Sequence, residues 1–177
     1  IMLHGGEVYL THYSTRYGIR ETKNPQSYRH HKYNLSSKDI CTDNPAESIA
    51  ERKRITAAII KKNLNRGKKT VFISIHADYL PNKTRDLPIT FFYHRLTRLD
   101  GGKSMRFARR LSKAVTGTEK NCKAKGLGVL YKNPADLEIL IELANLNNKN
   151  GAWRLRYHTY REKLAKILCD GLMEALR

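Results

Sequence analysis

Two polar residues stand at or within largely aliphatic runs that predict strands. His76 follows the run Val71–Ile75, and Glu142 lies inside the run Leu137–Leu143. An ionised carboxylate among aliphatic side chains is costly to bury unless it is paired or coordinated. Glu142 is therefore either ion-paired with an arginine near the end of its strand or held with a raised pKa, the form that a general base takes. His76 is either a hydrogen-bonded structural residue or a metal ligand.

The elements around these two residues alternate between strands and helices. This alternation predicts an α/β fold, with a three-layer, mostly parallel sheet flanked by helices. Ligands of such sheets collect beyond the carboxyl ends of the strands, where His76 is expected. The expected helices are Ser48–Asn65, Ser104–Val115 and Trp153–Leu176, the last being the longest. The expected strands are Gly6–Thr11, Thr70–His76 buried on both faces, Thr90–Tyr93, Leu127–Tyr131 at an edge and Leu137–Leu143 in the centre.

A long polar segment interrupts this pattern after the first expected strand. Residues 12–44 are rich in basic residues and tyrosines and show no helix or strand periodicity, so we interpret them as an insertion within one domain spanning residues 1–177. The chain has 177 residues and begins with Ile1, so we expect that this domain is N-terminally incomplete. The cysteines Cys41, Cys122 and Cys169 form no CxxC pair, which disfavours a sulfur-ligated zinc site and a disulfide scaffold.

The chain is strongly basic. The sequence has 34 Lys and Arg against 16 Asp and Glu, a formal net charge of +18. Such an excess favours anionic partners. No apolar stretch approaches the roughly 20 residues of a membrane-spanning helix. A nucleic-acid binder would share the charge, but no zinc-finger, RNP or helix-turn-helix pattern is visible, so we expect no specific nucleic-acid binding.

Two motifs together resemble a known family. The run Val71–Asp78, with the sequence Val-Phe-Ile-Ser-Ile-His-Ala-Asp, and the later run Ile139–Asn148 are similar to motifs of the zinc-dependent N-acetylmuramoyl-L-alanine amidases, hydrolases of the bacterial cell wall. The resemblance implies Zn2+ as cofactor, His76 as one of its ligands and Glu142 as the catalytic glutamate. A hydrogen-bond acceptor that does not itself bind the metal should orient the His76 ring, and Asp78 is one candidate.

The remaining metal ligands of that family have no clear counterpart here. They are a His in an Asp-x-Gly-His-Gly-Gly turn and a Glu after it, both before the strand that Gly6–Thr11 resembles. His4 has the right neighbours, Gly5 and Gly6, but no Asp or apolar strand precedes it. We therefore expect the other ligands upstream of Ile1, with His4 as a weaker candidate.

The resemblance also implies an activity and a location. It implies hydrolysis of the amide between N-acetylmuramic acid and L-alanine in peptidoglycan, in the periplasm or outside the cell. A regulatory activator protein is a further implied partner, because some relatives block their zinc with a helix that could correspond to residues 12–44. A catalytically silent wall-binding relative and a basic nucleic-acid binder are the alternative hypotheses.

Overall fold

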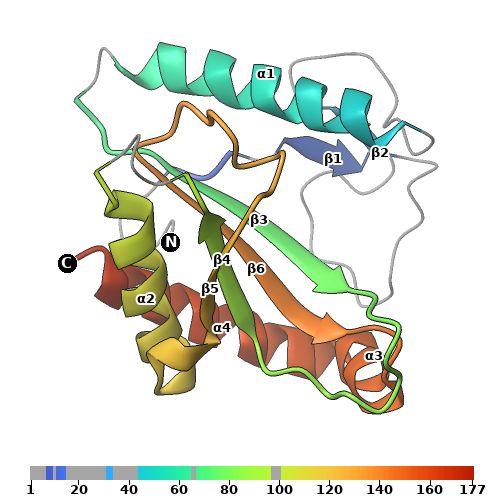
Figure 1. Ribbon diagram of the computed structural model, residues 1–177. Coiled ribbons are helices and arrows are strands. Elements are labelled where there is room, and N and C mark those ends of the chain that lie inside the picture. The colour runs from blue at the N-terminus through green and yellow to red at the C-terminus, as the bar shows by residue number, and fades with distance from the viewer. Residues whose placement is uncertain (1–6, 10, 15–30, 34–43, 65–66, 97–100) are drawn as a thin grey trace. The chain divides into compact units, whose positions relative to one another are not determined.

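The computed structural model describes residues 7–9, 11–14, 31–33, 44–64, 67–96 and 101–177 (Figure 1). The chain divides into two compact units, Ile1–Thr70 with Lys132–Ala135 and Val71–Tyr131 with Asp136–Arg177. The expectation of one domain over residues 1–177 stays a prediction. The second unit carries both His76 and Glu142.

The first unit contains two short strands and a long helix. β1 (His12–Ser14) and β2 (His31–Tyr33) pair in antiparallel register, with His12 opposite Tyr33. α1 (Pro45–Leu64) confirms the helix predicted near Ser48–Asn65. It begins where the Glu47 backbone N–H donates to Asn44 Oδ1 at 3.2 Å, a capping contact.

The predicted strand at Gly6–Thr11 is wrong for its described residues. Neither Glu7–Tyr9 nor Thr11 is in a strand. Val8 and Tyr9 are 48% and 45% exposed, so their high β-propensity is not supported by burial against a sheet. Within the predicted insertion at 12–44, residues 15–30 and 34–43 lie outside the described residues, and its role stays a prediction.

The second unit contains a four-stranded sheet in the order β3-β6-β4-β5. β3 runs parallel to β6 and β4 parallel to β5, while β4 and β6 are antiparallel. The predicted α/β class with a mostly parallel sheet is confirmed, as is the interior position of β6. The bounds are β3 (Val71–Asp78), β4 (Thr90–His94), β5 (Cys122–Lys125) and β6 (Leu137–Asn145).

Two helices cover one face of this sheet (Figure 1). α2 (Lys103–Thr116) and α4 (His158–Ala175) place apolar side chains against alternate residues of β4 and β6. Side chains alternate between the two faces of a strand, so the intervening residues point to the opposite face. The buried cluster consists of Phe91, Phe107, Ala108, Leu111, Ile139, Ile141, Leu164, Leu168, Leu172 and Ala175.

The C-terminal helix prediction is wrong in one respect. The segment predicted as one helix over Trp153–Leu176 forms α3 (Lys149–Arg156) and α4, separated by the extended residue Tyr157. Arg161 Nη1 donates to the carbonyls of Leu155 and Arg156, which satisfies the end of α3 and stabilises the break. α1, with 20 residues, is longer than the 18 residues of α4.

Two strand predictions also need correction. Leu127–Tyr131 forms a turn in which the Leu130 and Tyr131 N–H groups donate to the Leu127 carbonyl, and the edge strand is β5 instead. β3 is an edge strand of the sheet, and its Ile75 is 59% exposed, so β3 is not buried on both faces. It also continues beyond His76 to Asp78.

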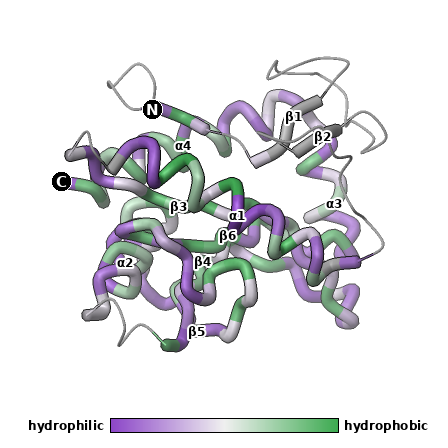
Figure 2. The backbone as a smooth tube through the Cα atoms, turned by 90° about the horizontal axis from the view of Figure 1, so that it is seen from above, coloured by the Kyte–Doolittle hydropathy of each residue, from purple (hydrophilic) through white to green (hydrophobic). Residues whose placement is uncertain are grey.

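No helix among the described residues is both long and apolar enough to cross a membrane. Hydrophilic segments interrupt α1, α2 and α3 in Figure 2. Cys122 and Cys169 are not joined by a disulfide, and Cys41 lies outside the described residues.

Candidate active site

The parallel pairing of β3 and β6 brings the two candidate residues side by side. His76 and Glu142 are register partners, five residues after the pair Val71 and Leu137 with which the pairing of the two strands begins. The core on the helix side takes Ile139 and Ile141, so His76 and Glu142 both point to the other face of the sheet. Residues 66 positions apart in the sequence therefore lie side by side on one face of the sheet.

Glu142 is a buried carboxylate, and hydrogen bonds from the described residues do not satisfy both of its oxygens. It is 9% exposed, and its Oε2 has no hydrogen-bond partner within the described part of the chain. Burial, with a smaller contribution from the negative charge of Asp78 and an opposing one from Lys125, raises the pKa of Glu142 to about 7. The ion pair with an arginine that the sequence allowed is not formed by the described residues. A carboxyl group with a pKa near neutrality can both accept and return a proton.

His76 is oriented by a neighbour on its own strand. Ser74 Oγ and His76 Nε2 are 2.9 Å apart, within hydrogen-bond distance. Ser74 is buried, whereas His76 is exposed, so the serine anchors the ring from the sheet side. The sequence reasoning missed Ser74, although two residues apart on one strand always face the same way.

Asp78 occupies a different place from the one expected. The register between β3 and β6 shifts after His76, so that Asp78 pairs with Asn145. Asp78 Oδ1 accepts a hydrogen bond from the Tyr79 backbone N–H at 2.9 Å. Its effect on the site is electrostatic, through the pKa of Glu142. Its orientation of His76 stays a prediction.

The described residues do not complete a zinc site. Within them, no group of at least three His, Cys, Asp or Glu side chains converges to hold a metal ion. A catalytic zinc requires three protein ligands and one open position, and His76 is the one predicted ligand that falls within the described part of the chain. His4, the weaker candidate, lies outside the described residues. Glu142 Oε2, which no described residue contacts by a hydrogen bond, fits a role as proton acceptor.

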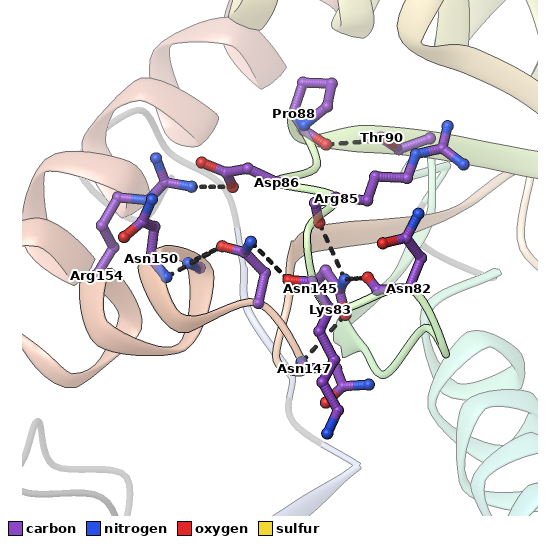
Figure 3. A network of polar contacts seen from close by, with 12 residues as sticks. Asn82, Lys83, Arg85, Asp86, Pro88, Thr90, Asn145, Asn147, Asn150 and Arg154 are labelled. Atoms are coloured by element: carbon purple, nitrogen blue, oxygen red, sulfur yellow. Dashed lines mark hydrogen bonds and ion pairs between the residues drawn. The ribbon is translucent and has the colours of Figure 1, made fainter.

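An asparagine network fixes the loop that follows β3 (Figure 3). Asn145 Nδ2 donates to the carbonyls of Asn82 and Arg85, both at 3.0 Å. Its Oδ1 accepts from the backbone N–H groups of Leu80 at 3.0 Å and Asn147 at 3.1 Å. Three of these four hydrogen bonds join one fully buried amide to residues 80–85 and hold this loop at the end of β6.

Two further asparagines extend this network. Asn147 Nδ2 donates to the Leu80 carbonyl at 2.7 Å, and Asn148 Nδ2 donates to the Lys83 carbonyl at 2.9 Å. Asn148 Oδ1 also caps α3 through the backbone N–H groups of Asn150 and Gly151. The sequence reasoning missed these positioning roles, although the three asparagines directly after an apolar strand were a visible signal.

The sequence matches the family described as N-acetylmuramoyl-L-alanine amidase, Amidase_3, over residues 7–174. No curated protein matches the chain. The family match covers β3 and β6 together with the helices between and after them.

Solved structures share the fold. The chain is similar to the catalytic domain of CwlV, an N-acetylmuramoyl-L-alanine amidase from Bacillus (Paenibacillus) polymyxa var. colistinus, with 22% identity, 72% of this chain and 65% of that chain covered, and a TM-score of 0.54. It is also similar to the apo N-acetylmuramyl-L-alanine amidase of Mycobacterium abscessus, with 20% identity, 73% and 61% covered, and a TM-score of 0.58.

A third solved structure is the CwlD amidase from Clostridioides difficile in complex with the GerS lipoprotein. It has 20% identity to this chain, a TM-score of 0.54, and 78% of this chain and 68% of that chain covered. The alignment with the CwlV catalytic domain, described above, spans just under two thirds of that domain. At these identities the likeness is one of fold.

Proposed function

Because the chain belongs to the N-acetylmuramoyl-L-alanine amidase family, we propose that it hydrolyses the amide bond between N-acetylmuramic acid and L-alanine in peptidoglycan. One observation supports this most directly: Glu142, buried with a pKa of about 7 and with no partner for its Oε2 among the described residues, lies beside His76. That surface has a group suited to move a proton near neutral pH.

In the proposed reaction, Glu142 is the general base and then the general acid. Its carboxylate takes a proton from the attacking water as the water oxygen bonds to the lactyl carbonyl carbon. The carboxylic acid then returns that proton to the amide nitrogen as the carbon–nitrogen bond breaks. The products are the free lactyl carboxylate and an L-alanine amine. Asp78 assists by keeping the pKa of Glu142 high.

We propose zinc as the cofactor, with His76 as one ligand and the other ligands outside the described residues. Bound zinc supplies Lewis acidity and lowers the pKa of a coordinated water towards about 7. Ser74 serves this arrangement by holding the His76 ring through Nε2.

The proposed setting is the cell envelope, in the periplasm or outside the cell, where peptidoglycan is found. The excess of basic residues, a net charge of +18, suits anionic wall polymers. A regulatory partner is part of the proposal, and one structural neighbour was solved in complex with a lipoprotein. Residues 12–44 are the proposed site of that regulation.

The proposal is tested by metal analysis and product analysis on the same purified protein. We expect about one zinc ion per chain, as in mononuclear catalytic sites. We also expect digestion of sacculi to release peptides with free L-alanine amino groups and no new reducing sugar ends. Zinc-loaded protein that sediments with sacculi but releases no such peptides would contradict the proposal and indicate the silent wall-binding alternative.

A further inference from the structure

An exposed aromatic pair lies on and just after α3. Trp153 is 57% exposed and Tyr157 is 49% exposed, with their ring centroids 5.4 Å apart in a T-shaped arrangement. The Arg156 guanidinium lies 6.0 Å from the centre of the Trp153 ring. A tryptophan side chain in water forgoes the hydrophobic stabilisation that burial of its large surface would give. This cluster therefore needs an explanation that the core does not supply.

The surface around Trp153 forms a shallow, open hollow and is basic. A hollow of about 420 Å³ is lined, among the described residues, by Lys149, Asn150, Ala152, Trp153 and Arg156. α3 has the sequence Lys-Asn-Gly-Ala-Trp-Arg-Leu-Arg and contains no acidic residue. The hollow therefore combines an aromatic ring with two cationic side chains.

We propose that this hollow binds the glycan strand of peptidoglycan, with the Trp153 ring under a sugar and Lys149 and Arg156 on its carboxylates. The C–H bonds on one side of a pyranose ring pack well on an indole face. Muramic acid lactyl groups that have lost their peptides, and the carboxylates of peptide stems, are suited to arginine and lysine. This inference rests on the proposed function, because it assigns a subsite of the same substrate.

α3 holds this surface rigidly. Asn148 caps its first turn, and Arg154 forms an ion pair with Asp86 in the loop after β3. Gly151 lies so close to β6 that an added Cβ would come within 2.6 Å of the Asn145 carbonyl oxygen. Because these three contacts already hold α3 in place, its surface loses little conformational freedom when a ligand binds.

The position of α3 suits a polymeric substrate. α3 directly follows β6 and lies at the end of the sheet to which both β3 and β6 run (Figure 1). His76 and Glu142 lie in the last part of these same strands. A glycan strand on α3 would thus bind at the end of the sheet that carries the proposed catalytic residues.

Intrinsic fluorescence gives a direct test, because Trp153 is the single tryptophan of the chain. The protein carries Glu142→Gln so that the ligand stays intact, and the probe is soluble peptidoglycan glycan fragments of several disaccharides. We expect a saturable change in emission intensity and a shift to shorter wavelength. Saturable binding in a parallel calorimetric titration without any change in emission would overturn the assignment of Trp153.

Sedimentation with sacculi gives the quantitative test. In the Glu142→Gln background, Trp153→Ala should raise the dissociation constant about tenfold, a loss in the upper range for one aromatic contact. Trp153→Phe should restore part of the affinity. Ile167→Ala, which removes a side chain on α4 that is 37% exposed, is the matched control and should leave binding unchanged.

The two proposals fail separately. If unmodified protein cleaves sacculi while Trp153→Ala sediments like its parent, the glycan platform is wrong and the amidase proposal stands. If sacculi are bound through Trp153 but never cleaved, the platform stands and the amidase proposal is wrong.

Discussion

Glu142 and Asn145 are buried polar residues on the same strand, three positions apart, and their surroundings are opposite. The Asn145 side chain is fully buried and makes four hydrogen bonds, so its amide is satisfied. Glu142 is 9% exposed, and its Oε2 has no partner among the described residues. The structure thus separates two uses of a buried polar group.

This difference shows where β6 is built for stability and where it retains reactivity. A satisfied amide stabilises and orders the loop that contacts it, since each of its bonds replaces one to water. A low-dielectric environment destabilises the ionised form of a carboxylate, so burial raises the pKa of Glu142. The first arrangement positions chain segments, and the second keeps a group ready to bind a proton.

The largest expected effect comes from removing the reactive group. Glu142→Gln keeps the shape of the side chain but cannot take a proton, so the rate of peptidoglycan hydrolysis should fall by roughly 10²–10⁴. Release of free L-alanine amino groups from sacculi measures this rate. Circular dichroism should be unchanged, which separates lost chemistry from lost folding. A variant with more than a tenth of the original rate would refute the role of Glu142.

The next largest effect is the loss of stability expected when the hydrogen-bonded amide of Asn145 is removed. Asn145→Leu leaves two carbonyls and two N–H groups without their partner, so the free energy of unfolding should fall by about 3–5 kcal/mol. Urea unfolding measures the loss. Asn150→Ala, an exposed asparagine beside the same network, is the control and should change stability by less than about 0.5 kcal/mol. A loss below about 1 kcal/mol for Asn145→Leu would show that the network is not structural.

The smallest effect is the pH dependence of stability in the metal-free protein. Folding raises the pKa of Glu142 from 4.5 to about 7, so the folded state binds this proton more tightly than the unfolded state. Its contribution to stability is complete below about pH 4.5 and is lost as the pH rises through 7. Relative to Glu142→Gln, the unmodified protein should lose up to about 3 kcal/mol over this range. Parallel stability curves for the two proteins would contradict the raised pKa.

The sequence was a good guide to β3, β6 and α2, because long apolar runs and a regular helical period leave few alternatives. It was a poor guide to Leu127–Tyr131, where short apolar runs fit a turn as well as a strand, and to the break at Tyr157, which depends on Arg161 reaching back to the end of α3. The anomaly at Glu142 was visible in the sequence, whereas Ser74 beside His76 and the partners of Asn145 were not recognised.

The amino-acid sequence by itself determined the α/β class, the family motifs and the presence of a carboxylate in an aliphatic strand, because these depend on local pattern. Only the tertiary structure decided that His76 and Glu142 are register partners, since strand pairing joins residues far apart in the chain. It also decided which buried polar group is satisfied, because three of the four partners of Asn145 come from a loop 60–65 residues earlier. Hydrogen-bond satisfaction is a property of neighbours in space, and so are the burial and the nearby charges that set the pKa of Glu142.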